Sequence, residues 1–342
     1  MAPSIAVCMA TYQPALDLLA RQLRSIREQT YSDFVCIVSD DASAPPVAKA
    51  IEQACAEDAR FRYVNSDRLG YYRNFERCLE LVPPGVEFVA FSDQDDVWHA
   101  DKLETLANVL CDERVKLAYA DMAIVSADGE RLAPSYWTDR SNNHTELASL
   151  LLINTVTGAA SLFRRELLDV ALPFPDTPGT PFHDHWLACI ALALGEIAFV
   201  DRPLHDYVQH GGNVVGRHEP LPDELRGGLV NALSRFVRNP PRRIRNTVRW
   251  ARRYYEDEVV VREAFACALR DRLSGRVDPE AAAAIDRVAD MSSSTRSLLW
   301  LLGRSALDVR GDSPTLGIEN QLIKGILWHR LHRGQAPLSN GS

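Results

Sequence analysis

The sequence predicts an α/β protein with a mixed, mostly parallel sheet flanked by helices, followed by a helical C-terminal region. Apolar segments of strand length alternate with amphipathic helical segments as far as Leu117, which is the pattern of a parallel sheet. After about residue 220 the pattern becomes mainly helical, with breaks at Pro240-Pro241 and around 311–314. We therefore expect two parts, residues 1–219 and residues 220–342.

Hydrophobic periodicity divides the first part into elements. Strands are expected at 5–10, 34–41, 61–66 and 86–93, and helices at 15–29, 47–58, 72–82 and 96–110. Further strand candidates at 117–125 and 157–163 precede a Pro/Gly-rich loop, a mostly buried helix at 185–195 and a strand pair at 196–210. The stretch after the first strand, CMATYQP, contains no glycine, so a Rossmann dinucleotide site is not expected.

Composition excludes several classes of protein. The 342 residues are 46% hydrophobic and 25% charged, as in ordinary globular proteins, and the net charge of −8 argues against nucleic acid as a partner. Seven scattered cysteines, several in apolar runs, indicate core residues in a reducing compartment. Neither a signal peptide nor an apolar run of about 18 residues is visible. We expect a cytoplasmic protein.

Polar residues follow three of the expected strands. Thr11-Tyr12, Asp40-Asp41 and Asp93-Gln94-Asp95-Asp96 each stand where an apolar run ends. Ligands of parallel α/β sheets bind beyond the carboxyl ends of the strands. The repetition therefore predicts a ligand site at this edge of the sheet.

Three carboxylates within four positions need a neutralising partner. Like charges this close raise one another's pKa, and hard divalent ions such as Mg²⁺ or Mn²⁺ prefer oxygen ligands. A solvated acidic turn that begins the next helix is the alternative, because acids are favourable near a helix N-terminus.

Six stretches, in order along residues 4–217, carry a resemblance to a known family: VCMATYQP, IVSDDAS, FSDQDDVW, TGAASLFRREL, FHDHWLA and YVQHGGNVVG. The chain resembles glycosyltransferase family 2, inverting enzymes with the A-type fold, and within it the rhamnosyltransferase-like branch. The resemblance implies a nucleoside-diphosphate sugar donor (dTDP-rhamnose or a UDP-sugar) and Mn²⁺ or Mg²⁺. It also implies a hydroxyl acceptor on a saccharide or polyprenyl-linked saccharide, in cell-surface polysaccharide synthesis.

The resemblance assigns the nucleotide pocket to Thr11, Tyr12, Asp40 and Asp41. The two carboxylates can accept hydrogen bonds from a base N–H and from ribose hydroxyls. They could instead cap the following turn, since Ala42 and Ser43 suit a turn. Three arginines are further candidates for the diphosphate: Arg68, Arg73 and Arg217.

By the same resemblance Asp93 and Asp95 are the metal-binding DxD pair, and Asp93 also touches the donor. Asp96 is a third candidate, or a helix cap or a residue that orients a ligand. His210 reaches the metal or the diphosphate, the alternative being a surface histidine. Trp98 either stacks on a sugar or packs in the core.

The resemblance makes Asp184 the general base that takes the acceptor's proton. A simple helix N-cap is the alternative. His183 and His185 flank it and could tune its pKa, whereas a zinc site lacks further ligands nearby. Besides Trp98, five residues are expected beside the sugar or acceptor: Gly158, which lets backbone approach closely, Ala159, His183, His185 and Trp186.

The segment from Arg226 to Arg253 contains nine arginines and no acid. Such a run can bind an anionic membrane surface or a lipid-diphosphate acceptor, which would make the protein peripheral at the inner face of the membrane. A nucleic-acid patch and an exposed face paired with acids elsewhere are the alternatives.

Together the sequence predicts a metal-dependent inverting glycosyltransferase. Two other classes of function stay open: a metal-dependent phosphohydrolase acting on nucleotide sugars, and a non-catalytic sugar-binding scaffold.

Overall fold

The computed structural model describes residues 4–137, 142–177, 179, 181–210, 250–308, 315 and 317–332. These residues fall into two compact units. The first contains the described residues from 4 to 210 other than 151–153 and 175–181, and those two short segments belong with 250–332 in the second.

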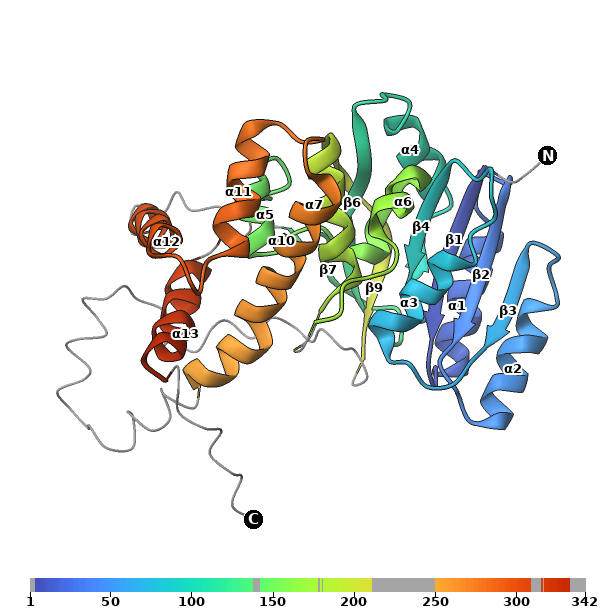
Figure 1. Ribbon diagram of the computed structural model, residues 1–342. Helices are drawn as coiled ribbons and strands as arrows, with labels where there is room; N and C mark the ends of the chain where they lie inside the picture. The colour runs from blue at the N-terminus through green and yellow to red at the C-terminus, as the bar shows by residue number, and fades with distance from the viewer. Residues whose placement is uncertain are drawn as a thin grey trace, which may run out of the picture. The chain divides into compact units, whose positions relative to one another are not determined.

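The first unit is built on one mixed sheet (Figure 1). In the described chain its strand order is β3-β2-β1-β4-β8-β6-β9-β5, with β7 paired to β6. The strands β3, β2, β1 and β4 are parallel, β8 runs antiparallel between β4 and β6, and β9 is parallel to β6. The strand bounds are β1 Ile5–Thr11, β2 Phe34–Asp40, β3 Phe61–Asn65, β4 Phe88–Ser92, β5 Val97–Trp98, β6 Val115–Ser126, β7 Arg131–Ala133, β8 Ser161–Arg164 and β9 Glu196–Gln209.

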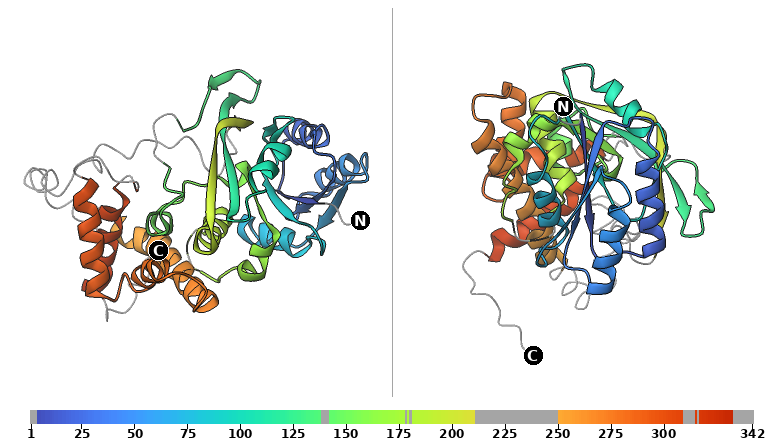
Figure 2. Two further views of the ribbon diagram at one scale, coloured as in Figure 1. Left: turned by 90° about the horizontal axis from the view of Figure 1, so that it is seen from above. Right: turned by 90° about the vertical axis from the view of Figure 1, so that its right-hand side faces the viewer.

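Helices cover both faces of this sheet (Figure 2). On β1 the side chains of Ile5, Val7 and Met9 join a core cluster with α1, α2 and α4, whereas Cys8 contacts the carbonyl of Cys78 on α3. The strands are therefore apolar on both faces, as a buried parallel sheet requires. The helix bounds in this part of the chain are α1 Leu16–Arg27, α2 Pro45–Cys55, α3 Tyr71–Glu80, α4 Lys102–Val109, α5 Leu147–Leu152, α6 Leu168–Ala171 and α7 His183–Leu194.

The predicted α/β class and the alternation of strands and helices are confirmed. The helix expected at 96–110 is wrong in its first turn, because Val97 and Trp98 form β5, which pairs with His205 and Asp206 of β9. A β-branched residue and an aromatic one suit such a ladder. The helix α4 begins only at Lys102.

Two expected strands also differ from the structure. The segment from 157 starts with a 3₁₀ turn at Gly158–Ala160, and β8 begins at Ser161. The expected strand pair at 196–210 is one long strand, β9. Its register against β6 shifts on both sides of the pair Asp121 and Pro203, which is where a proline, lacking an N–H, cannot continue the ladder.

The second unit is helical where it is described. A π-helical turn at Tyr255–Val259 precedes α10 Val260–Leu273, α11 Pro279–Ala289, α12 Thr295–Asp308 and α13 Ile318–His332. Asp278 caps α11 by accepting hydrogen bonds from the N–H groups of Glu280 and Ala281 at 2.9 and 2.8 Å. No helix among the described residues is both long and apolar enough to cross a membrane. The predicted helical C-terminal region is thus confirmed.

Most of the arginine-rich segment, with Arg217, lies outside the described residues. Its last two arginines are described: Arg252 pairs with Glu256 at 2.8 Å and Arg253 with Asp257 at 3.2 Å. These two arginines therefore agree with the alternative that the segment is an exposed face whose arginines pair with acidic residues. The boundary expected near residue 219 stays a prediction.

Candidate functional site

The three polar clusters meet at the carboxyl edge of the sheet, because β2, β1 and β4 are adjacent and parallel. Thr11 at the end of β1 is in register with Asp40 at the end of β2, and Met9 is in register with Ser92 at the end of β4. The acidic motif follows Ser92 directly. The convergence of these clusters at one edge is as predicted, and their role as a ligand site stays a prediction.

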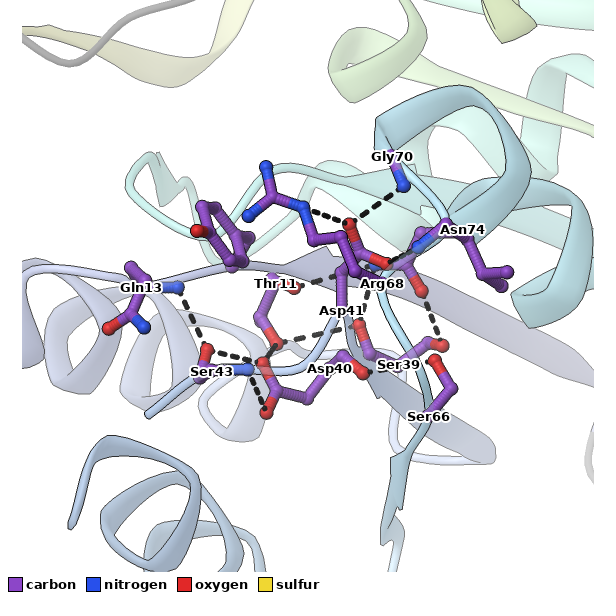
Figure 3. Close-up of polar contacts among 12 residues, drawn as sticks. Thr11, Gln13, Ser39, Asp40, Asp41, Ser43, Ser66, Arg68, Gly70 and Asn74 are labelled. Atoms are coloured by element: carbon purple, nitrogen blue, oxygen red, sulfur yellow. Dashed lines mark hydrogen bonds and ion pairs between the residues drawn. The ribbon is translucent and has the colours of Figure 1, made fainter. Parts of the chain in front are cut away.

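Asp40 is fully buried and its carboxylate is used within the protein. It accepts hydrogen bonds from the Thr11 hydroxyl at 3.2 Å, and from the Ser43 hydroxyl and N–H at 2.6 and 3.2 Å (Figure 3). A fourth comes from the Tyr63 hydroxyl at 3.1 Å. A direct contact with a nucleotide is not available to Asp40 in this arrangement, which corrects that expectation. The turn-capping alternative describes it.

Asp41 is buried and fixes the loop that precedes α3. It accepts hydrogen bonds from the N–H groups of Leu69 at 2.5 Å and Gly70 at 2.9 Å and pairs with Arg68 at 3.3 Å (Figure 3). Gly70 has a φ of +82°, a conformation that favours glycine. Asp41 thus holds this loop, and its expected contact with a nucleotide stays a prediction.

Tyr12 and Arg68 are the exposed members of the expected nucleotide pocket. The Arg68 guanidinium lies 3.3 Å from the centroid of the Tyr12 ring, and the two side chains are 54% and 40% exposed respectively. A flat face of this kind suits stacking by a base. Arg73 is instead paired with Glu76 at 2.5 Å.

Two amides hold the strand ends together: Gln94, already part of a predicted polar cluster, and Asn74, which the sequence analysis missed. Asn74 donates to the Ser39 carbonyl at 2.9 Å and accepts from the Ser39 hydroxyl at 2.6 Å (Figure 3). Gln94 accepts from the Tyr12 N–H at 2.9 Å, which ties the acidic motif to the end of β1. A polar residue inside the apolar stripe of an amphipathic helix was the available signal for Asn74.

The acidic motif brings Asp93 and Asp95 together with His210. The Nε2 atom of His210 lies 2.8 Å from Oδ2 of Asp95. Burial, together with the charges of Asp95 and Asp184, raises the pKa of Asp93 to about 7. A site in which like charges crowd this closely favours a bound cation.

The side chains of Asp93, Asp95 and His210 are chemically suited to bind a divalent metal ion. Two carboxylates suit Mn²⁺ or Mg²⁺, whose remaining ligands are often waters and substrate phosphates, and an imidazole is a ligand more typical of transition-metal ions. Among the residues that the structure describes, no three His, Cys, Asp or Glu side chains are already arranged as a metal site.

Asp96 points away from this pair. It is fully buried, Oδ1 accepts from the Val208 N–H at 3.3 Å, and Oδ2 lies 3.8 Å from Nε2 of His205. Burial, with the charges of Asp93 and Asp95, raises its pKa well above the usual range. Asp96 is therefore neither an exposed metal ligand nor the cap of α4, whose N-cap position is Asp101.

Trp98 packs in the core, which corrects the expectation of a sugar contact. It is 3% exposed, and the Lys102 ammonium lies 3.8 Å from the centroid of its ring. The sequence analysis did not single out Lys102, although a lysine six residues after Asp96 was visible.

Asp184 lies in the first turn of α7 but is not its N-cap, a position that Phe182 occupies. Its Oδ2 accepts from the Gly158 N–H at 3.1 Å and its Oδ1 from the His185 N–H at 2.7 Å. Burial raises the pKa of Asp184 to about 6, against the lowering effect of these hydrogen bonds. A carboxylate with this pKa is ionised at neutral pH and is still basic enough to take a proton.

Gly158 approaches α7 so closely that no side chain fits there. A Cβ at this position would lie 3.0 Å from Cβ of Asp184 and 3.0 Å from Nε2 of His183. This agrees with the close backbone approach expected of Gly158. Ala159 is buried, and its carbonyl accepts a hydrogen bond from Lys102.

The neighbours of Asp184 face inward. His183 stacks on Phe75 with ring centroids 3.7 Å apart, and burial lowers its pKa to about 3, so it stays neutral. The Nε2 atom of His185 lies 2.7 Å from the Leu150 carbonyl, and the buried Trp186 donates to the Ala171 carbonyl at 3.0 Å. The expected sugar or acceptor contacts of His185 and Trp186 are therefore corrected, and the two imidazoles do not share a zinc ion.

Comparisons with known proteins agree with this architecture. Residues 6–171 match the family model described as Glycosyl transferase family 2. The chain is also similar to S. aureus TarS, residues 1–349, in complex with UDP-GlcNAc, with a TM-score of 0.56 and 14% identity over 98% of this chain and 93% of that one. At this identity the likeness shows the fold alone.

Three curated relatives match shorter segments. An uncharacterised Mycobacterium tuberculosis protein is 32% identical over 48% of this chain and 54% of its own length. The succinoglycan biosynthesis protein ExoW of Rhizobium meliloti is 34% identical over 29% and 31%. The GalNAc(5)-diNAcBac-PP-undecaprenol beta-1,3-glucosyltransferase of Campylobacter jejuni is 29% identical over 30% and 33%. The matched segments thus span about half or a third of these relatives.

Three findings point to the same fold. They are the matched family model, the curled mixed sheet with helices on both faces, and the helical C-terminal region. Residues 6–171 are therefore similar to glycosyl transferase family 2, and the chain has a GT-A-like fold.

Proposed function

We propose that this protein is a metal-dependent inverting glycosyltransferase that moves a sugar from a nucleoside diphosphate to an acceptor hydroxyl in polysaccharide synthesis. One observation carries the proposal. Asp184, with its pKa raised to about 6, is held by the Gly158 N–H, and its charge acts on Asp93 of the acidic motif. The proposed base and the proposed cation-binding pair thus lie close enough for their charges to interact.

The chain's own residues supply binding and proton transfer. The stacked face of Tyr12 and Arg68 receives the base of the donor. Asp184 accepts the proton of the acceptor hydroxyl while the oxygen attacks the anomeric carbon, and the bond from that carbon to the diphosphate breaks. Attack from the face opposite the leaving group inverts the configuration. His183, neutral beside Asp184, adds no competing charge.

Asp93, Asp95 and His210 would hold Mn²⁺ or Mg²⁺. When bound, the ion supplies Lewis-acid stabilisation of the charge that grows on the departing diphosphate. Without it, the crowded carboxylates of Asp93 and Asp95 would repel that diphosphate.

The donor and acceptor are narrower parts of the proposal. The sequence resemblance favours a rhamnosyl donor such as dTDP-rhamnose, whereas the Campylobacter jejuni relative is named a glucosyltransferase. That name includes an undecaprenol-linked diphosphate, which supports a polyprenyl-linked saccharide as acceptor and peripheral contact with a membrane. The arginine-rich segment would supply the cationic surface for such contact.

The test is a panel of dTDP-, UDP- and GDP-sugars with Mn²⁺ or Mg²⁺, each with and without polyprenyl-diphosphate saccharides. We expect acceptor-dependent release of the nucleoside diphosphate and, by NMR of the product, inverted anomeric configuration. Release at the same rate without any acceptor would support the phosphohydrolase instead. Donor binding without turnover, with every acceptor offered, would support the sugar-binding scaffold.

A further inference from the structure

Lys102, the first residue of α4, is fully buried. Its ammonium lies 3.8 Å from the centroid of the Trp98 ring and donates a hydrogen bond to the Ala159 carbonyl. Lysine is almost never fully buried unless it is paired, because taking its charge out of water is costly. A lysine in this position therefore has a role that outweighs the cost of burying it.

The charge of Lys102 interacts with two carboxylates of the acidic motif. Asp96 and Asp93 are the acids whose charges favour the protonated lysine, against burial, which lowers its pKa to about 7. Lys102 in turn lowers the pKa of Asp93 and of Asp96. The protonation of Lys102 is therefore linked to that of Asp93 and Asp96.

The carbonyl that Lys102 holds belongs to the turn that touches Asp184. This 3₁₀ turn, Gly158–Ala160, presents its first N–H to Oδ2 of Asp184 at 3.1 Å. The Ser161 hydroxyl donates to the Gly158 carbonyl at 2.7 Å and fixes the other end of the turn. One peptide unit therefore separates the atom held by Lys102 from the residue that holds Asp184.

We propose that Lys102 is a positioning residue: its ammonium fixes the Gly158–Ala160 turn, and the turn holds the Asp184 carboxylate where it accepts the proton of the acceptor. The same side chain thereby links the acidic motif to the base. The inference rests on the proposed function for its catalytic meaning, whereas the physical link between Lys102 and Asp184 does not depend on it.

The main test replaces Lys102 by Met, which keeps the side chain's length and removes its charge and donors. We expect kcat to fall about 10- to 100-fold, the range found for residues that orient a catalytic group, with KM for the donor within about threefold. Lys102→Arg, which keeps charge and donors, should recover part of that loss. Lys116→Met is the matched control, because Lys116 pairs at the surface with Glu166 at 2.8 Å, away from the turn.

A second readout needs no turnover. The carboxyl carbon of Asp184, assigned by its disappearance in Asp184→Asn, is titrated by NMR in the metal-free protein. Because the Gly158 N–H lowers the pKa of Asp184, loosening the turn in Lys102→Met should move that titration above about 6. If wild type shows no transfer with any donor, the proposed function fails, and this titration still tests the link.

Ser161→Ala disturbs the same turn without altering a charge and covers the case in which Lys102→Met does not fold. It should raise the pKa of Asp184 in the same direction by a smaller amount. An unchanged Asp184 titration in Lys102→Met, or in Ser161→Ala where the former is insoluble, would overturn the proposal. So would a Lys102→Met enzyme whose loss lies wholly in KM.

Discussion

Nε2 of His210 lies 2.8 Å from Oδ2 of Asp95, although the two residues are 115 positions apart in the chain. The contact exists because β5, which follows the acidic motif, pairs antiparallel with β9, whose last residue directly precedes His210. The sheet thus delivers an imidazole to the carboxylates from the far end of the domain.

His210→Gln should weaken Mn²⁺ binding in the presence of nucleoside diphosphate by about 10- to 100-fold, because one donor near the metal is lost. Isothermal titration calorimetry measures it. The control is His99→Gln, which alters another His–Asp pair. In that pair Nε2 of His99 lies 3.1 Å from Oδ1 of Asp206 on β9. Equal affinity in both variants would remove His210 from the metal site.

Asp184→Asn should keep the fold and donor affinity and lose about 10²- to 10⁴-fold in kcat, because an amide still accepts from the Gly158 N–H and cannot take a proton. Asp169→Asn, at an exposed pair with Arg165, is the control. Activity of Asp184→Asn within threefold of wild type would show that Asp184 is not the base and has only a structural role at the start of α7.

The pH dependence of kcat follows from the same carboxylate. A base must be deprotonated, so at saturating donor and metal kcat should be level above pH 7 and fall about tenfold per unit well below the Asp184 pKa of about 6. His183, with its pKa lowered to about 3, should add nothing in this range. A profile that is flat down to pH 5 would be incompatible with Asp184 as the base.

Gly158→Ala should reduce kcat without unfolding the protein. The added Cβ would lie 3.0 Å from both Asp184 and His183, so one of them must shift by a few tenths of an ångström. A misplaced catalytic group typically costs up to about 10²-fold in rate. Gly303→Ala, where a Cβ meets nothing within 4 Å, is the control and should retain full activity.

The sequence predicted the sheet and the edge that carries the site, because periodicity and the ends of apolar runs are local signals. It could not show the inward turn of Asp40 and Asp96, since both side chains point at partners distant in the chain: Tyr63 for Asp40 and His205 for Asp96. Runs of acids look alike in sequence whether they face solvent or the core.

Lys102 was missed for a related reason. Its partner is a backbone carbonyl, Ala159, which no residue type reveals. Trp98 and Trp186 were misplaced because an aromatic beside a polar motif suits a sugar as well as a core. Tertiary packing decided these positions, and Asp95 with His210 was expected only through the family resemblance.

The last prediction concerns stability. Asp93 has a pKa raised from 3.8 to about 7, so its charged form is penalised in the folded, metal-free protein. The contribution that neutral Asp93 makes to the free energy of unfolding is fully present below pH 3.8, and it is lost as the pH rises through about 7. Asp93→Asn, which carries no charge, should therefore be more stable than wild type at pH 8, by about 1–2 kcal/mol after allowance for partial solvent exposure.

Urea unfolding at pH 8 and pH 5 measures this effect, and the gain should shrink at pH 5, where Asp93 of the wild type is itself largely neutral. Asp112→Asn is the control of opposite sign, because pairing with Arg114 lowers the pKa of Asp112 to about 2, and its loss should destabilise the protein at neutral pH. Adding Mn²⁺ should stabilise wild type more than Asp93→Asn. An Asp93→Asn protein that is less stable at pH 8, or equally stabilised by Mn²⁺, would show that Asp93 neither strains the folded site nor holds the ion.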